Sequence, residues 1–388
     1  MSSIPPKHLA DPVDKRPLTA VHGGLAGPAG TVYPEALGGW DLRPRGGGAP
    51  GDAPDDPNKS LQADIYDQRL GAMSDFDHPH NLMLVHQKGL LEALPLKRGD
   101  RVLEIGGHRS GLLPWLERTR GIVGTGLDIS PVWVAAQNAA ARARGSDTIW
   151  VLGDAEVLPF ADGAFAAVVA FDVFEHLTHL DRALTEAFRV LAPGGRLVVH
   201  MPVRDIDGSF DGFQRSRDPG DYAARQASVG HFHERMPTRR QMRTRLEGAG
   251  FQVLDLRSFN VWIQPLHDHR MLPWLGRMKN RRGDLGAGGQ PPHGGLAGRL
   301  RGRAASAPPL AGAGAASLAH ADSATPAASP ATPPGASGAT SGPPPTSRFT
   351  KLYARTVVPL AQALSAPDRL GSLLGIGGSC SFVAMKPG

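Results

Sequence analysis

The chain has 388 residues, and 49 Gly and 35 Pro show that a large part of it cannot belong to packed helices and strands. One folded domain with disordered sequence fits this composition better than two domains. The formal net charge of +6 is spread thinly, which is only mild evidence for an anionic partner. Cys380 is the single cysteine, which excludes an intramolecular disulfide and a multi-cysteine metal site.

The sequence predicts neither a secretory signal at the N-terminus nor a membrane-spanning segment. The N-terminal residues lack the apolar centre of a secretory signal, and the longest apolar run, at 165–171, is too short to span a bilayer. We therefore expect a cytoplasmic protein without a transmembrane segment.

The first hundred residues divide into two parts by composition. Residues 1–60 mix Pro, Gly, Asp and Ala without a sustained period, which predicts a disordered leader. Residues 61–98 place leucines at helical spacing, which predicts a helical lid ahead of the first strand.

Residues 99–262 alternate strand and helix patterns, which is typical of an α/β core. The expected strands are 101–105, 122–127, 148–152, 165–171, 196–201 and 251–256. Helix-start signals fall between them: Ser130 before Pro131, Thr178 with Asp181, and Thr238 with Gln241.

The remainder of the chain is less regular. Residues 263–283 interleave Met, Leu and Trp with Arg and Lys, which predicts a basic amphipathic segment that walls a pocket, with a lipid surface as the alternative. Residues 284–346 are a low-complexity insert of Gly, Ala, Pro and Ser. Ordered sequence returns in 347–388, with a helical segment and then a final strand.

The most informative motif is a glycine turn followed by an acid. Gly106 and Gly107 come directly after the first strand of the core, and Asp128 follows Glu104 by 24 positions at the end of the second strand. In doubly wound sheets such a turn lets the backbone approach a nucleotide, and an acid roughly 20 residues further on binds its ribose.

Several further motifs follow in order. They are GDAEVLPF at 153–160, the turn DGAF at 162–165, and PGG at 193–195 before the fifth strand. Together with the glycine turn, they make the chain resemble a class I S-adenosylmethionine-dependent methyltransferase of the small-molecule group, over roughly 62–262 and the last ten residues. The resemblance implies a Rossmann-like sheet of seven strands in the order 3-2-1-4-5-7-6, with helices on both faces and strand 7 antiparallel.

The resemblance also implies which residues bind S-adenosylmethionine. Asp128 would accept from the ribose hydroxyls and Ile129 would pack on the adenine, while Asp154 and the backbone of Ala155 would contact the adenine edge. The other expected contacts come from the first strand and its turn and from the end of the fourth strand: Glu104, Gly106, Gly107 and Phe171. The chain departs from the family at His108, where a glycine is usual, and this departure puts cofactor affinity in question.

Candidates for catalysis are histidines near the strand ends. An oxygen acceptor needs a base, and the nearest candidates for that role are His176, His231 and His233, of which His176 and His231 are the predicted catalytic residues. Each has a structural alternative, because histidines in loops are often hydrogen-bonded structural groups. Glu175 is equally compatible with a helix-start charge, and we expect no metal site.

Three functions remain open on the sequence. The first is methyl transfer to a small-molecule or lipid-like acceptor by in-line displacement, with peripheral membrane contact left open. The second is a catalytically weak, methyltransferase-like binding protein, and the third is an NAD-dependent oxidoreductase, against which the absence of GxGxxG counts. The fourth strand lacks the Asn/Asp-Pro-Pro-Tyr motif of enzymes that methylate nucleic-acid amino groups, so we expect no nucleic acid partner.

Overall fold

A computed structural model describes residues 6–44, 57–67, 76, 82–107, 111–228, 230–231, 233, 236–259, 261–262, 374 and 376–388. The predicted segments 263–283 and 284–346, and His108, lie outside these residues. No helix among the described residues is long and apolar enough to cross a membrane.

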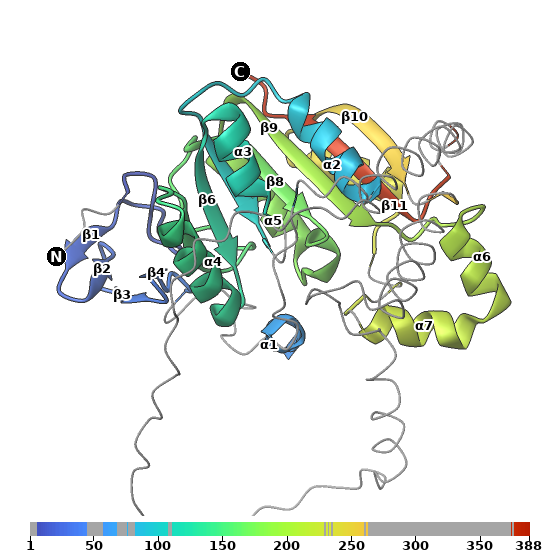
Figure 1. The fold of residues 1–388 in the computed structure, drawn as a ribbon, viewed down its shortest axis with the longest axis horizontal. Helices are drawn as coiled ribbons and strands as arrows, with labels where there is room; N and C mark the ends of the chain where they lie inside the picture. Colours follow the sequence, from blue (N-terminus) through green and yellow to red (C-terminus); the bar gives the residue numbers. More distant parts are fainter. Residues whose placement is uncertain are drawn as a thin grey trace, which may run out of the picture. The chain divides into compact units, whose positions relative to one another are not determined.

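A seven-stranded sheet organises the core (Figure 1). Its order is β10-β11-β9-β8-β5-β6-β7, which is the predicted 3-2-1-4-5-7-6 order read from the opposite edge. Neighbouring strands from β9 to β7 are parallel, and β11 is antiparallel to both β9 and β10. The strands are β5 (Arg101–Ile105), β6 (Val123–Asp128), β7 (Ile149–Leu152), β8 (Phe165–Phe171), β9 (Leu191–Pro202), β10 (Gln252–Phe259) and β11 (Ser379–Met385).

Helices cover both faces of this sheet. Along β5, Val102 faces a cluster with Leu91 and Leu116, whereas Leu103 faces a second cluster with Leu184. Alternate residues therefore serve opposite cores, as buried parallel strands require. The helices are α1 (Pro57–Asp67), α2 (Leu82–Glu92), α3 (Leu112–Arg120), α4 (Pro131–Ala143), α5 (Leu180–Val190), α6 (Phe210–Arg217), α7 (Pro219–Ser228) and α8 (Arg239–Gly248), with the 3-10 turn η1 (Phe174–His176) after β8.

Two of the three predicted helix starts are confirmed. Ser130 caps α4 by accepting from the backbone of Trp133, and Thr238 forms a complete capping box with Gln241. The prediction at Thr178 is wrong, because α5 starts at Leu180 after His179 and that start has no side-chain cap.

The prediction that residues 1–60 form a disordered leader is wrong for residues 6–44. They contain a four-stranded antiparallel sheet of β1 (Thr19–Val21), β2 (Gly24–Ala26), β3 (Val32–Ala36) and β4 (Gly39–Trp40). Its apolar residues are too few for a separate core, but Leu25, Tyr33 and Leu42 are buried in the same cluster as the main sheet. The segment is ordered because it buries its apolar surface against the α/β core rather than within itself.

Candidate functional site

Four parallel strands, β5 to β8, end at one edge of the sheet, and the candidate site lies at that edge. The turn after β5 has Gly106 at φ 69°, and its amide donates to the Leu127 carbonyl of β6 at 2.8 Å. A Cβ on Gly106 would lie 2.3 Å from the Val173 side chain, and one on Gly107 would lie 1.9 Å from the Trp150 ring. Both positions therefore require glycine, as the sequence pattern predicts.

Asp128 ends β6 directly beside this turn, with 8% of the residue exposed. Its Oδ1 accepts the backbone amide of Ser130 at 2.9 Å. Burial raises the pKa of Asp128 to about 6, against the opposing effect of amides from Ser130, Ile129 and Gly107, and the nearby Asp67 carboxyl adds to the rise. A buried acceptor beside a glycine turn is the group that the two hydroxyls of a ribose need, so these residues fit S-adenosylmethionine.

The loop after β7 carries Asp154, Ala155 and Glu156. The Asp154 Oδ1 atom accepts the amide of Glu156 at 2.8 Å, and Ala155 is buried. Lys59 of α1 pairs with Asp154 at 2.7 Å and with Glu156 at 2.9 Å. Burial acts to lower the pKa of Lys59, but the two carboxylates outweigh it and raise that pKa above its usual value.

Helix α1 continues along this edge of the sheet (Figure 1). Beyond Lys59, its Gln62 amide donates to the Gly230 carbonyl at 3.4 Å. In its last turn, the Tyr66 hydroxyl lies 2.9 Å from His176 Nε2, and Asp67 accepts the hydroxyl of Ser130. Helix α1 therefore contacts Asp154, which is predicted to bind the adenine, and His176, which is a predicted base. It also contacts Ser130, whose amide donates to the predicted ribose ligand Asp128. No sequence motif pointed to these α1 residues, because each contact joins segments far apart along the chain.

The structure brings the two predicted catalytic histidines together. His176 and His231 have ring centroids 5.0 Å apart, and Glu175 Oε1 lies 3.8 Å from His176 Nε2 and 3.5 Å from His231 Nε2. The Glu175 side chain is fully buried, and neither of its oxygens has a hydrogen-bond partner among the described residues. Burial lowers the pKa of His176, so its imidazole is neutral at pH 7 and able to accept a proton.

A second polar group lies at the end of β8. Asp172, at φ 55°, accepts from His200 Nδ1 at 3.0 Å, and His200 Nε2 lies 3.1 Å from the Ser379 hydroxyl of the closing strand. Phe171, a predicted cofactor contact, packs edge-on against the His200 ring at 6.4 Å between centroids. Glu104, the other predicted strand residue, is 3% exposed on β5.

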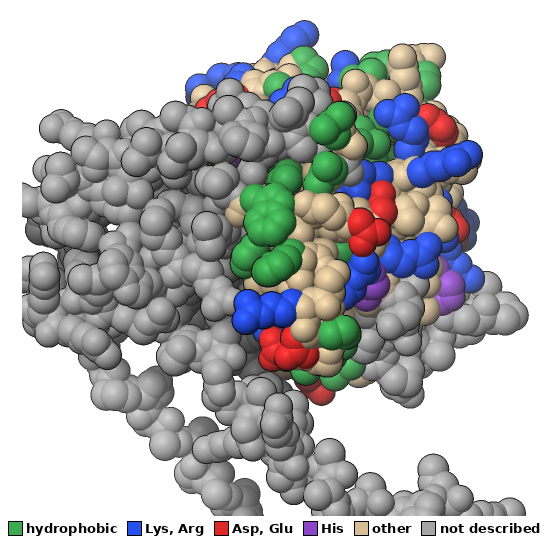
Figure 2. Space-filling model, turned by 90° about the vertical axis from the view of Figure 1, so that its right-hand side faces the viewer, with side chains coloured by type: hydrophobic (Ala, Val, Ile, Leu, Met, Phe, Trp, Pro, Cys, Tyr) green, Lys and Arg blue, Asp and Glu red, His purple; other side chains and the backbone are tan. Residues whose placement is uncertain are grey.

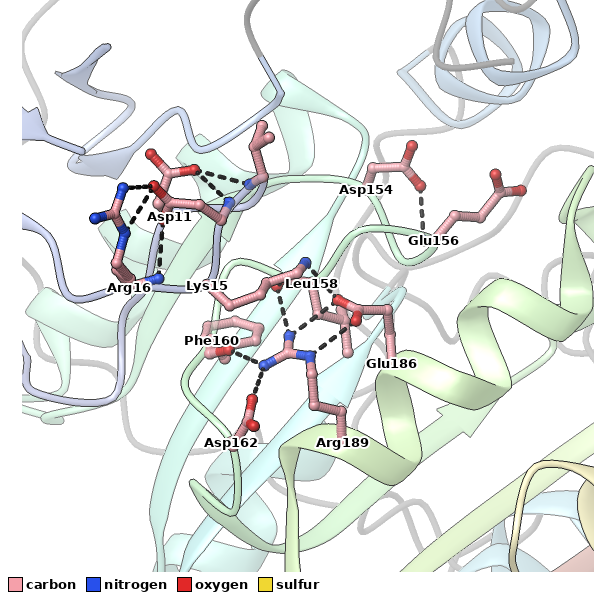
Figure 3. A network of polar contacts seen from close by, with 12 residues as sticks. Asp11, Lys15, Arg16, Asp154, Glu156, Leu158, Phe160, Asp162, Glu186 and Arg189 are labelled. Carbon is pink, nitrogen blue, oxygen red and sulfur yellow. Dashed lines mark hydrogen bonds and ion pairs between the residues drawn. The ribbon is translucent and has the colours of Figure 1, made fainter. Parts of the chain in front are cut away.

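The N-terminal segment and α5 both contact the loop that begins at Asp154 (Figure 3). Lys15 pairs with Glu186 of α5 at 2.7 Å, and Arg189 of the same helix pairs with Glu186 at 2.8 Å. The Arg189 guanidinium also donates to the Leu158 and Phe160 carbonyls at 3.0 and 2.6 Å. These contacts connect the loop that begins at Asp154 to α5 and to the segment before β1, through Lys15.

Comparison with known proteins agrees with this geometry. A family described as "Methyltransferase domain" matches residues 103–199. The UbiE ubiquinone/menaquinone biosynthesis C-methyltransferase of Neisseria meningitidis is 31% identical over 44% of this chain and 75% of its own length. The mitochondrial 2-methoxy-6-polyprenyl-1,4-benzoquinol methylase of Rattus norvegicus is 35% identical over 34% of this chain and 44% of its own length.

The chain spans about half the length of the first curated relatives that it matches. Among solved structures, phosphoethanolamine N-methyltransferase 2 of Haemonchus contortus in complex with S-adenosyl-L-methionine is 14% identical, with a TM-score of 0.46 over 87% of this chain and 59% of that one. The predicted family and sheet are confirmed by the sequence relatives and by the strand order. The chain belongs to the class I S-adenosylmethionine-dependent methyltransferases, in the group that includes the UbiE C-methyltransferases.

Proposed function

We propose that the protein transfers a methyl group from S-adenosylmethionine to a small-molecule acceptor. The observation that carries this proposal is Asp128, a buried carboxyl at the end of β6 beside the Gly106-Gly107 turn. S-adenosylmethionine, the methyl donor of this family, fits this site, because the two hydroxyls of its ribose can both donate hydrogen bonds to the Asp128 carboxylate.

Gly106, Gly107, Asp128, Ile129, Asp154 and Ala155 would hold the donor, whose sulfonium supplies an activated methyl carbon. The protein's own task is then alignment of the acceptor and exclusion of water. Buried groups around the end of β8 suit that task, because Glu175 is 6% exposed and His200 is 1% exposed.

We further propose a hydroxylated aromatic acceptor of the quinol type. One relative is named as a polyprenyl-benzoquinol methylase, and another as a C-methyltransferase of ubiquinone and menaquinone biosynthesis. Loss of a hydroxyl proton makes a quinol ring more nucleophilic. The neutral, buried His176 is placed to accept that proton. A lipid-like tail would find apolar surface at Phe213 and Trp262, whose exposed rings have centroids 5.6 Å apart. The side of the molecule that carries α6 and α7 also has basic and acidic groups interspersed among apolar ones (Figure 2).

Calorimetric titration tests the cofactor part of the proposal. The protein should bind S-adenosylmethionine and its demethylated product, S-adenosylhomocysteine, but not NAD. Binding of NAD alone would support the oxidoreductase alternative, and binding of neither would contradict the enzyme assignment. Incubation with quinols and with simple carboxylic acids then tests the acceptor class, since methylation only of the acids would overturn the quinol proposal.

A further inference from the structure

Glu175, which is buried, and His176 and His231, which are partly buried, form a three-residue cluster that the proposed methyl transfer does not fully explain. One ligand atom from each lies within 4.8 Å of the others. The segments that supply them are distant in sequence: η1 carries Glu175 and His176, and His231 follows α7. A buried carboxylate without a hydrogen-bond partner among the described residues is costly unless a cation or a donor balances it.

The surroundings of the two histidines define which ring nitrogen faces the carboxylate. His176 Nδ1 lies 3.2 Å from the Gly230 carbonyl, which can only accept, so Nδ1 carries the proton of the neutral ring. His231 Nδ1 lies 2.9 Å from the Gln226 side-chain oxygen, which selects the same tautomer for a neutral ring. In that tautomer Nε2 carries the lone pair, and the Nε2 atoms of both rings lie on the side of Glu175.

This arrangement has the features of a metal-binding site. Ligand atoms about 2.0–2.1 Å from a tetrahedral metal are separated by about 3.4 Å, and the two Nε2 atoms lie 3.8 and 3.5 Å from Glu175 Oε1. The Gly230 carbonyl accepts from Nδ1 of His176 and fixes the tautomer of that ring, as the hydrogen-bond partners of metal-binding histidines do. The Tyr66 hydroxyl meets His176 Nε2 at 2.9 Å, so metal uptake exchanges that hydrogen bond for a coordinate bond.

We propose that Glu175, His176 and His231 bind a divalent transition metal, such as Zn²⁺, through two imidazoles and one carboxylate. Three protein ligands leave a coordination position open, which is typical of catalytic rather than structural sites. Resting on the proposed function, we assign this position to a hydroxyl oxygen of the acceptor. The metal would lower the pKa of that hydroxyl and orient the ring. With Nε2 of His176 bound to the metal, the hydroxyl proton would pass to water, so in the metal-loaded site the metal takes over the role proposed above for His176 as base.

Metal uptake by the full-length protein tests the site. Chelator-treated protein should bind one equivalent of Zn²⁺ by calorimetry, and Mg²⁺ should not compete. With Co²⁺, the protein should give the visible absorption spectrum of a Co²⁺ ion with a low coordination number. Glu175→Gln and His231→Asn should each weaken Zn²⁺ binding by more than the roughly 10–100-fold that loss of an outer partner costs. His233→Asn is the matched control, because His233 pairs with Arg215 outside the cluster and should leave Zn²⁺ affinity unchanged.

Absence of stoichiometric Zn²⁺ and Co²⁺ binding would overturn the proposal, and so would a Glu175→Gln protein with unchanged Zn²⁺ affinity. Titration with S-adenosylhomocysteine distinguishes a failure of the metal proposal from a failure of the proposed methyl transfer. The Glu175→Gln protein should bind that ligand as the wild type does, since Glu175 is not among the residues assigned to the donor. Zn²⁺ binding without any S-adenosylhomocysteine binding would leave the metal site standing and remove the methyl-transfer role.

Discussion

Replacement of Asp128 by Asn should remove both the affinity for the methyl donor and the pH dependence of that affinity. The carboxylate is assigned to two ribose hydroxyls, and a hydrogen bond to a charged group contributes about 1.5–3 kcal/mol. Loss of the charge at both should therefore weaken S-adenosylhomocysteine binding by at least about 100-fold at pH 7.5.

The pKa of Asp128 gives a second and independent magnitude. Two hydroxyl donors require the ionised carboxylate, and the pKa of Asp128 in the free protein is about 6. Below that pH, binding must first remove a proton, so affinity falls as pH falls. From pH 7.5 to pH 5 the wild type should lose about tenfold in affinity, equivalent to about 1.4 kcal/mol.

Calorimetry with S-adenosylhomocysteine across pH 5 to 7.5 measures both effects. Asp128→Asn should bind weakly and show no such slope, whereas Asp207→Asn, with an exposed carboxyl, should behave as the wild type does. A flat wild-type profile, or a retained slope in Asp128→Asn, would refute the reasoning.

Three further substitutions test the supporting structure by chemical unfolding. Arg189→Met should lower the free energy of unfolding by about 2–3 kcal/mol because it removes the guanidinium that pairs with Glu186 and donates to the Leu158 and Phe160 carbonyls, and Lys15 replaces only part of these contacts. The exposed Arg16→Met should change it by less than about 0.5 kcal/mol, and equal effects of the two substitutions would contradict this role of Arg189. Gly106→Ala should cost about 2–3 kcal/mol through its positive φ and the contact with Val173, and a neutral result would mean that the turn is misplaced. Burial and the Arg101 charge lower the pKa of His8 to about 4, so unfolded His8 gains a proton before folded His8 does. The contribution of His8 to stability should therefore fall by about 2 kcal/mol from pH 7 to pH 5, measured as the difference between the pH dependence of the wild type and that of His8→Asn. Equal pH dependence in the two proteins would contradict this origin.

Much of the core could be predicted because its elements are specified locally. The apolar run at 165–171 became β8 with the predicted bounds, and 101–105 became β5. The predicted fifth strand began at 196, but β9 starts at Leu191, because Leu191 already pairs with Phe165 of β8 and the backbone of Gly194 and Gly195 pairs with Lys386 near the end of the chain. The cap predicted at Thr178 failed for a similar reason: Glu156 accepts the amide of His179 at 2.8 Å and holds the start of α5 through a tertiary contact.

In the candidate site, too, some residues could be predicted from local sequence, whereas contacts between distant segments could not. Gly106, Gly107 and Asp128 could be placed from sequence because strand ends and turns fix them. The ion pair of Lys59 with Asp154 could not, because it joins α1 to a loop about a hundred residues away. Glu175 looked like a helix-start charge, and only the fold brings His231 to within 3.5 Å of it.

Transfer of an isotopically labelled methyl group from S-adenosylmethionine tests the central claim most directly. Incubation with a reduced quinol should yield one labelled methyl in the product for each S-adenosylhomocysteine formed. At the same donor concentration, chosen below saturation of the wild type, Asp128→Asn should form far less of both products. Saturating donor binding without labelled product from any small-molecule acceptor, or equal turnover by Asp128→Asn, would contradict the account.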